Sequence, residues 1–155
     1  MSDDKKEMQP GEYDCLRLEN QLCFPLYACS KEVVRTYQPF LHELDLTYTQ
    51  YITLMVLWEK KEVNVKEIGE KLYLDSGTLT PLLKKLEAKG YIKRTRSKLD
   101  ERNVLIKITP EGEDLRRQAL SVPSSMSRCI QLPMEDAVEL RRILTEMMEI
   151  MRKGS

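Results

Sequence analysis

The stretch that decides the fold spans residues 63–92 and reads VNVKEIGEKLYLDSGTLTPLLKKLEAKGYI. Asn64 has the right chemistry to cap a short helix that follows it, and Asp75 or Ser76 to cap a second one. Gly90 suits the end of this second helix, because glycine adopts the left-handed conformation there without strain. Two short helices joined by a tight polar turn predict a helix-turn-helix.

Two strands are predicted directly after these helices. The sequences YIKRTRS and NVLIKIT read as strands on either side of the charged sequence KLDER. Val104, Ile106 and Ile108 recur at every second position, as expected for a strand with one buried face. A helix-turn-helix followed at once by a β-hairpin is a winged helix. The predicted fold class is therefore mainly α with a small β-hairpin wing.

Helical segments are predicted on both sides of this region. Apolar residues in the range 15–44 recur with a helical pattern, in which Pro39 is expected to end or kink the helix. Thr47 and Gln50 can form a capping box ahead of the apolar run YITLMVLWEK. The sequence TPEG starts a further helix, with Pro110 at its first position.

An apolar stripe marks the last helical segment. Its near-heptad spacing suits packing against another helix, either in a dimer interface, which we favour, or on the domain's own core. The stripe consists of Leu140, Ile143, Leu144, Met147, Ile150 and Met151. We expect a flexible tail at 1–13 and one domain at 14–155, with a winged helix-turn-helix at about 47–112 and dimerisation helices at 14–46 and 113–152.

Composition excludes several classes of protein. The 155 residues suffice for one ordinary domain, and the apolar run at 52–58 is far too short to span a membrane. The polar N-terminus does not resemble a signal peptide, so we expect a cytoplasmic protein without a membrane partner. Four cysteines in a reducing compartment are not expected to form disulfide staples. Their spacing contains no CxxC, so we expect no metal site, and no cofactor.

Basic residues are concentrated in one part of the chain. The net charge is zero, but residues 84–107 hold nine basic and three acidic residues. A local basic excess of this kind is the electrostatic footprint of nucleic-acid binding, although a solvated lysine-rich surface has it too. The winged helix favours double-stranded operator DNA as the partner.

The residues expected to contact DNA follow from the usual docking of this fold. The start of the second helix faces the bases, basic residues contact phosphates, and an arginine at the wing tip suits a narrow minor groove. Each of these residues, taken alone, is also typical of an exposed cap or loop. The predicted DNA-binding residues are Asp75, Ser76, Gly77, Thr78, Thr80, Lys84, Lys85, Arg96, Asp100 and Arg102.

The sequence NQLCFPLYACS contains the candidate for redox chemistry, Cys23. Only a thiolate attacks peroxide quickly, and a thiolate needs hydrogen-bond donors or positive charge to stabilise it. No Lys, Arg or His lies within one helical turn of Cys23, so protonated tyrosine hydroxyls are the candidate donors. Tyr27 is four residues further on and can share its face of a helix. An inert buried thiol is the competing interpretation.

Three segments resemble one protein family. LENQLCFPLYA, LDLTYTQYITLMVLWE and the sequence from VKEIGEKLYLDSG to NVLIKITPEG resemble the MarR family of winged-helix regulators. Within that family, NQLCFPLYA and LDLTYTQY resemble the OhrR-like group, which senses organic hydroperoxides. The resemblance covers about residues 18–112 and extends more loosely to the C-terminus.

The resemblance implies roles for particular residues. Cys23 would be the peroxide-reactive residue, and Tyr27, Tyr37 and Tyr48 would donate hydrogen bonds to its sulfur. Cys129 lies where some members carry a second cysteine that forms an intersubunit disulfide; in others a low-molecular-weight thiol takes that role. Cys15 and Cys29 match no such position, and Cys29 is expected in the core.

Helix geometry indicates which subunit supplies one donor. In a straight helix the fourteen residues from Cys23 to Tyr37 span about 21 Å, so a partner subunit would have to supply Tyr37. This agrees with the homodimer that the resemblance implies.

The expected function is a redox-sensing repressor, not an enzyme. Organic hydroperoxide would oxidise Cys23, a disulfide would form, and operator DNA would be released. A repressor released by a small-molecule effector at the dimer interface, with Cys23 not the sensor, is the main alternative. A thiol peroxidase is a third, in which the winged helix would have no purpose.

Overall fold

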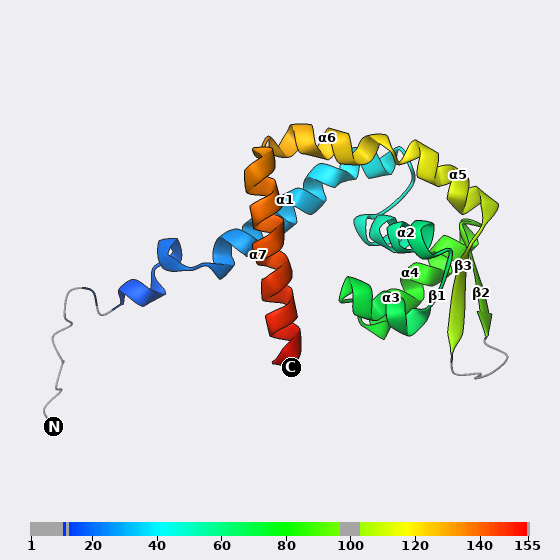
Figure 1. Ribbon diagram of the computed structural model, residues 1–155, viewed down its shortest axis with the longest axis horizontal. Coiled ribbons are helices and arrows are strands. Elements are labelled where there is room, and N and C mark those ends of the chain that lie inside the picture. The colour runs from blue at the N-terminus through cyan, green and yellow to red at the C-terminus, as the bar shows by residue number, and fades with distance from the viewer. Residues whose placement is uncertain (1–10, 12, 97–102, 155) are drawn as a thin grey trace, which may run out of the picture. The chain divides into compact units, whose positions relative to one another are not determined.

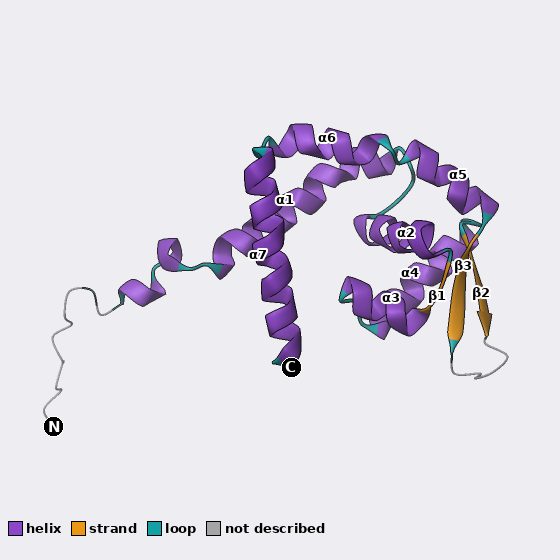
Figure 2. Ribbon diagram, viewed as in Figure 1, coloured by secondary structure: helices purple, strands orange, loops and turns teal. Residues whose placement is uncertain are grey.

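The computed structural model describes residue 11, residues 13–96 and residues 103–154, and divides between Thr36 and Tyr37 into two compact units. Most of the expected N-terminal tail lies outside these residues. Figures 1 and 2 show the elements. They are two short 3-10 helices (Asp14–Leu16 and Leu18–Asn20), α1 (Cys23–His42), α2 (Tyr48–Lys60), β1 (Glu62–Asn64), α3 (Val65–Leu72), α4 (Ser76–Ala88), β2 (Ile92–Arg96), β3 (Val104–Ile108), α5 (Pro110–Gln118), α6 (Ser121–Ile130) and α7 (Met134–Lys153).

The first long helix differs from its prediction at the N-terminal end, and of the two alternatives for Pro39 the structure excludes the helix end. It begins at Cys23 and not near residue 15, because side-chain bonds fold the preceding segment into 3-10 turns; Gln21 Nε2, for example, donates to the Cys15 carbonyl at 2.6 Å. Pro39 lies inside the helix and does not end it. Its ring removes one backbone hydrogen bond, but the helix continues to His42, and the fully buried Leu41 anchors the last turn.

The helix-turn-helix is confirmed, and its capping residues are those that the sequence indicated. Thr47 and Gln50 form both hydrogen bonds of the capping box, and Asn64 accepts a bond from the Glu67 N–H at 2.8 Å. The turn between α3 and α4 begins at Tyr73, whose φ of 56° is left-handed. Gly69 allows this close turn, because a Cβ there would lie 2.8 Å from the Leu74 carbonyl.

The sheet has three antiparallel strands in the order β1-β3-β2, one more than the predicted hairpin. The additional strand β1 is only three residues long and pairs Val63 with Ile106. In the predicted hairpin, Ile92 pairs with Ile108 and Arg96 with Val104. The first ladder fixes the start of α3 against the wing, since β1 runs directly into that helix.

The hydrophobic core of the second unit lies where α2, α3 and α4 meet the sheet (Figure 1). Each fully buried leucine or isoleucine there contributes roughly 1.5–3 kcal/mol relative to an exposed position. The largest fully buried aliphatic side chains after residue 50 are Leu54, Leu57, Ile68, Leu79, Leu83, Leu86 and Ile106. These residues hold the recognition helix α4 and the wing in one body.

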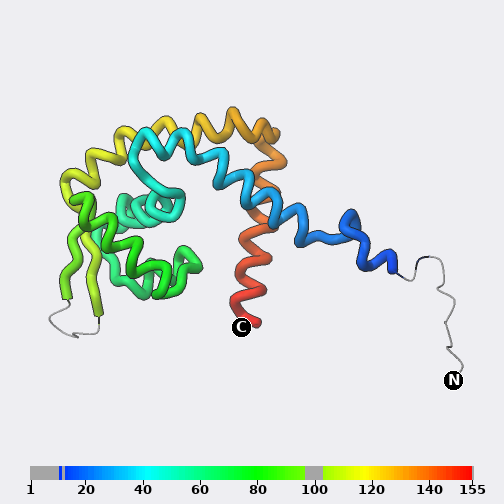
Figure 3. The backbone as a smooth tube through the Cα atoms, turned by 180° about the vertical axis from the view of Figure 1, so that it is seen from behind, coloured from blue at the N-terminus to red at the C-terminus, as the bar shows by residue number. Residues whose placement is uncertain are grey.

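Three helices follow the wing, and Figure 3 traces them to the C-terminus. Thr109 caps α5 with Pro110 at its first position, as predicted. The last helix, α7, buries none of its residues, and Ile143 and Ile150 are 47% and 71% exposed. The apolar stripe therefore does not dock on the chain's own core. Among the described residues no helix is long and apolar enough to span a membrane.

Candidate functional site

The N-terminus of α4 is organised by Asp75. Its carboxylate accepts hydrogen bonds from the Thr78 backbone N–H at 2.9 Å and from the Thr78 hydroxyl at 3.1 Å. These two bonds lower the pKa of Asp75. Asp75 is thus the cap, and Ser76 is the first residue of the helix with an exposed side chain. The Thr78 hydroxyl donates its proton to this cap, so toward DNA it can offer only its oxygen as an acceptor.

Removing this cap is expected to destabilise the protein in a pH-dependent way. Because the folded pKa of Asp75 lies below its unfolded value of about 3.9, the stability it contributes is present above that value and is lost as pH falls through the folded pKa. Asp75→Ala should therefore lower the melting temperature at pH 7, and the difference from wild type should shrink below about pH 4. Asp75→Asn, which retains a capping acceptor, is the control for thermal melts followed by circular dichroism. A pH-independent difference would contradict the assignment.

The two faces of α4 have different chemistry. Leu79, Leu82, Leu83 and Leu86 are buried on one face. The opposite, exposed face carries the polar and basic residues that the sequence predicted for DNA: Ser76, Gly77, Thr80, Lys84 and Lys85. A groove lies beside this face, between α3, α4 and β3, and residues such as Tyr73, Thr80 and Val104 line it.

The basic residues of the wing do not all lie on one surface. Arg94 Nε binds Glu87 Oε2 of α4 at 2.7 Å, which lowers the pKa of Glu87. Side chains alternate along a strand, so Arg96 shares the α4-facing side with Arg94, whereas Lys93 and Lys107 lie on the other side. The described basic residues of the wing, Lys93, Arg94, Arg96 and Lys107, are therefore divided between two faces. The predicted residues Asp100 and Arg102 lie outside the described residues.

Cys23 is the first residue of α1, where unpaired backbone N–H groups favour a negatively charged group. Its thiol is free and exposed. Tyr27 lies one turn further along the helix, as predicted, and its ring is 5.1 Å from the Lys31 ammonium. Both Cys23 and Tyr27 belong to the first unit.

The other three cysteines are also free and exposed. Cys129 lies in the last turn of α6. The prediction that Cys29 is a core residue is wrong, because Leu41 is the one buried residue of α1 and the first turns of this helix provide no core. Within the described ranges, no group of three or more His, Cys, Asp or Glu side chains could hold a metal ion.

Tyr37 and Tyr48 lie side by side in the second unit. Their ring centroids are 4.9 Å apart, and Tyr51 joins them with its ring 6.0 Å from that of Tyr37. Burial raises the pKa of all three phenols, and repulsion from Tyr48 adds to the rise at Tyr37 and Tyr51. All three hydroxyls therefore stay protonated at neutral pH and can donate hydrogen bonds. The sequence analysis missed Tyr51, although its position three residues after Tyr48 on a helix was a usable signal.

Comparison with known proteins gives a consistent result. A family model described as transcriptional regulator SarA/Rot matches residues 35–118. The organic hydroperoxide resistance transcriptional regulator of Bacillus subtilis (strain 168) is 44% identical over 143 residues, covering 92% of this chain and 97% of that protein.

Solved structures of AbfR from Staphylococcus epidermidis are also similar. Reduced AbfR bound to DNA has a TM-score of 0.75 and 34% identity, covering 90% of this chain and 96% of that one. Disulfide-formed AbfR has a TM-score of 0.62 and 35% identity, covering 91% and 99%.

Proposed function

Because the chain belongs to the SarA/Rot and MarR-type family of winged-helix transcriptional regulators, we propose that it is a repressor whose Cys23 senses organic hydroperoxides. Members of this family are dimeric DNA-binding proteins and not enzymes. The observation that carries the proposal is the contact between Tyr37 and Tyr48, whose rings are 4.9 Å apart and whose phenols burial keeps protonated. The resemblance to the OhrR-like group implies that these two tyrosines bind the reactive sulfur.

The proposed DNA interface is the exposed face of α4 together with the wing. Short side chains at the start of the helix contact base edges, and Gly77 lets the backbone approach. Lys84, Lys85 and Arg96 neutralise phosphates, and binding is therefore salt-dependent. Asp100 and Arg102, which lie outside the described residues, are proposed from the sequence alone, with Arg102 contacting the minor groove. The division of the wing's charges supports this arrangement, because Arg96 lies on the side that faces α4.

The proposed redox step begins with the Cys23 thiolate, which attacks the terminal oxygen of the hydroperoxide. The O–O bond breaks, the alkoxide takes a proton and leaves as an alcohol, and Cys23 becomes a sulfenic acid. A second thiol then attacks this sulfur and water leaves, so that a disulfide forms. The second thiol is Cys129 of the other subunit or a low-molecular-weight thiol. The exposure of both Cys23 and Cys129 supports this step.

The tyrosine donors are proposed to come from the partner subunit. The helix α1 is continuous from Cys23 through Tyr37, and fourteen residues at 1.5 Å each separate them by about 21 Å along it. A hydrogen bond within one subunit would need that helix to break. In the reduced dimer the tyrosine hydroxyls donate hydrogen bonds to the Cys23 thiolate. Oxidation removes the negative charge of this sulfur, so it no longer accepts these bonds.

The test compares operator DNA binding before and after one equivalent of cumene hydroperoxide. We expect the reduced wild-type protein to bind and to lose about ten-fold or more in affinity on oxidation. Cys23→Ser should bind equally well and keep its affinity, with Cys15→Ser as the matched control that still responds. Fluorescence anisotropy measures binding, and non-reducing gels distinguish an intersubunit disulfide from a small-thiol adduct. If peroxide still released operator DNA from Cys23→Ser, Cys23 would not be the sensor, and another effector would be favoured.

A further inference from the structure

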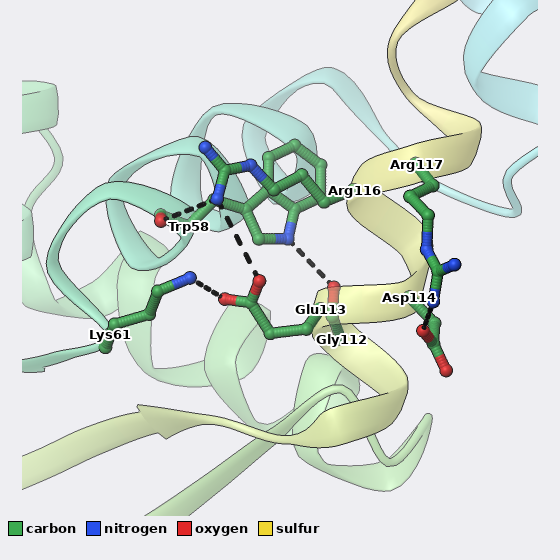
Figure 4. A network of polar contacts seen from close by, with 7 residues as sticks. All are labelled: Trp58, Lys61, Gly112, Glu113, Asp114, Arg116 and Arg117. Atoms are coloured by element: carbon green, nitrogen blue, oxygen red, sulfur yellow. Dashed lines mark hydrogen bonds and ion pairs between the residues drawn. The ribbon is translucent and has the colours of Figure 1, made fainter.

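A buried tryptophan joins the start of α5 to α2 of the winged helix-turn-helix, the DNA-reading region. The indole N–H of Trp58 on α2 donates to the Gly112 carbonyl at 2.8 Å, and Trp58 is only 7% exposed (Figure 4). The Trp58 carbonyl in turn accepts a bond from Arg116 Nη1 at 3.4 Å. At the edge of this contact, Glu113 pairs with Lys61. Trp58 therefore bonds to two successive turns of α5.

A chain of aromatic rings connects this fastening to the paired tyrosines. The Tyr51 ring meets the Trp58 ring edge-on, with centroids 6.2 Å apart and an angle of 70° between their planes. Tyr51 also packs against Tyr37, which packs against Tyr48. Tyr51 is 3% exposed. Tyr37 itself is half-buried, but interiors are close-packed, so a Tyr37 ring that moves toward the buried Tyr51 must displace it.

The chain of rings ends at α5, and this helix is packed too closely against the start of the wing to move independently of it. A Cβ at Gly112 would lie 2.3 Å from the Tyr91 carbonyl, so the helix backbone touches the residue before β2. Thr109, the cap of α5, makes two hydrogen bonds here. Its N–H donates to the Tyr91 carbonyl at 3.1 Å, and its hydroxyl donates to the Gly90 carbonyl at 2.6 Å. A movement of α5 therefore acts directly on the junction between α4 and the wing.

We propose that Tyr51 and Trp58 are positioning residues that transmit the state of the tyrosine pair to α5 and the base of the wing. The inference rests on the proposed function, since it needs oxidation of Cys23 to change what Tyr37 and Tyr48 bind. When the sulfur no longer accepts their hydrogen bonds, the two rings repack. Tyr51 and Trp58 follow, and the hydrogen bond to Gly112 carries the change to the DNA-reading region.

The first test is the ratio of DNA affinities between reduced and oxidised protein. Trp58→Phe keeps an aromatic ring but loses the N–H donor. We expect oxidation to weaken DNA binding about ten-fold in wild type and about three-fold or less in Trp58→Phe, with equal Cys23 oxidation by mass spectrometry. Ile68→Val is the matched control, because Ile68 is fully buried in α3 and its truncation also lowers stability. Ile68→Val should keep the full ten-fold ratio between the DNA affinities of reduced and oxidised protein. If Trp58→Phe acted only by lowering stability, it would keep that ratio too.

The second test needs no variant of the chain of rings. Trp58 is the only tryptophan in the sequence, so its fluorescence reports on this site alone. Its emission should change on oxidation of wild type, at the rate of DNA release, and stay constant in Cys23→Ser. An unchanged emission, or an unchanged affinity ratio in Trp58→Phe, would overturn the proposed link while leaving the sensor intact. Release of DNA from oxidised Cys23→Ser would instead refute the sensor itself.

Discussion

Gly112→Ala is expected to lower the free energy of unfolding by about 3 kcal/mol, near the upper end of what overpacking costs. The added methyl would lie 2.3 Å from the Tyr91 carbonyl and 2.7 Å from Ile108 Cδ1. The isoleucine side chain can rotate away, but the carbonyl belongs to the backbone and accepts a hydrogen bond from Thr109. Relief therefore requires α5 to move away from the wing, which also strains the bond from Trp58.

Urea denaturation followed by circular dichroism measures this loss. Gly154→Ala is the control, because a Cβ there would meet its nearest atoms only at ordinary contact distances of 3.8–3.9 Å. It should change stability by less than about 0.5 kcal/mol, as exposed substitutions usually do. If Gly112→Ala were as mild as this control, α5 would have room beside the wing that the structure does not show.

The parts of the fold that sequence predicted well are those that local chemistry determines. The capping box of Thr47 and Gln50 and the cap at Asn64 depend on residues within one turn, and all form. The recognition helix follows from its caps, and the second strand of the wing from the alternation of Val104, Ile106 and Ile108. The parts that were missed depend on distant partners. The strand β1 is three residues long and exists because β3 lies beside it, and no local pattern announces that pairing.

The candidate site divides in the same way. The polar residues of α4 could be predicted because this fold places the start of its second helix on the bases, and the four leucines buried on the opposite face agree with that prediction. The pairing of Arg94 with Glu87 could not, since it joins a helix to a strand, and it removes one of the nine basic residues from the surface available to DNA. The residues Tyr37 and Tyr48 were found through resemblance. The contact of Tyr37 with Tyr51 joins residues of α1 and α2, and no local pattern predicts it, whereas Tyr51 and Trp58 lie about two turns apart on α2 itself.

Ile143→Asp is expected to convert the dimer to a monomer and to weaken operator binding by about 100-fold or more. The helix α7 buries no residue within its own chain, and its stripe at Leu140, Ile143 and Ile150 is at least 46% exposed. A second copy of the chain is the partner that this family provides, because its members are dimeric. A charge placed in that stripe would be desolvated in the interface at a large cost. A monomer contacts one half-site alone and loses the 10²–10⁴-fold gain, in order of magnitude, that linked binding provides.

Analytical ultracentrifugation measures the oligomeric state, and anisotropy on a two-half-site operator measures the affinity. Thr145→Asp is the matched control, since two residues along a helix place Thr145 about 200° from Ile143, on the opposite face. It introduces the same charge into the same helix and should leave both the dimer and DNA binding unchanged. A dimeric Ile143→Asp protein would mean that the apolar stripe of α7 lies outside the interface and that the helices before it carry the dimer alone.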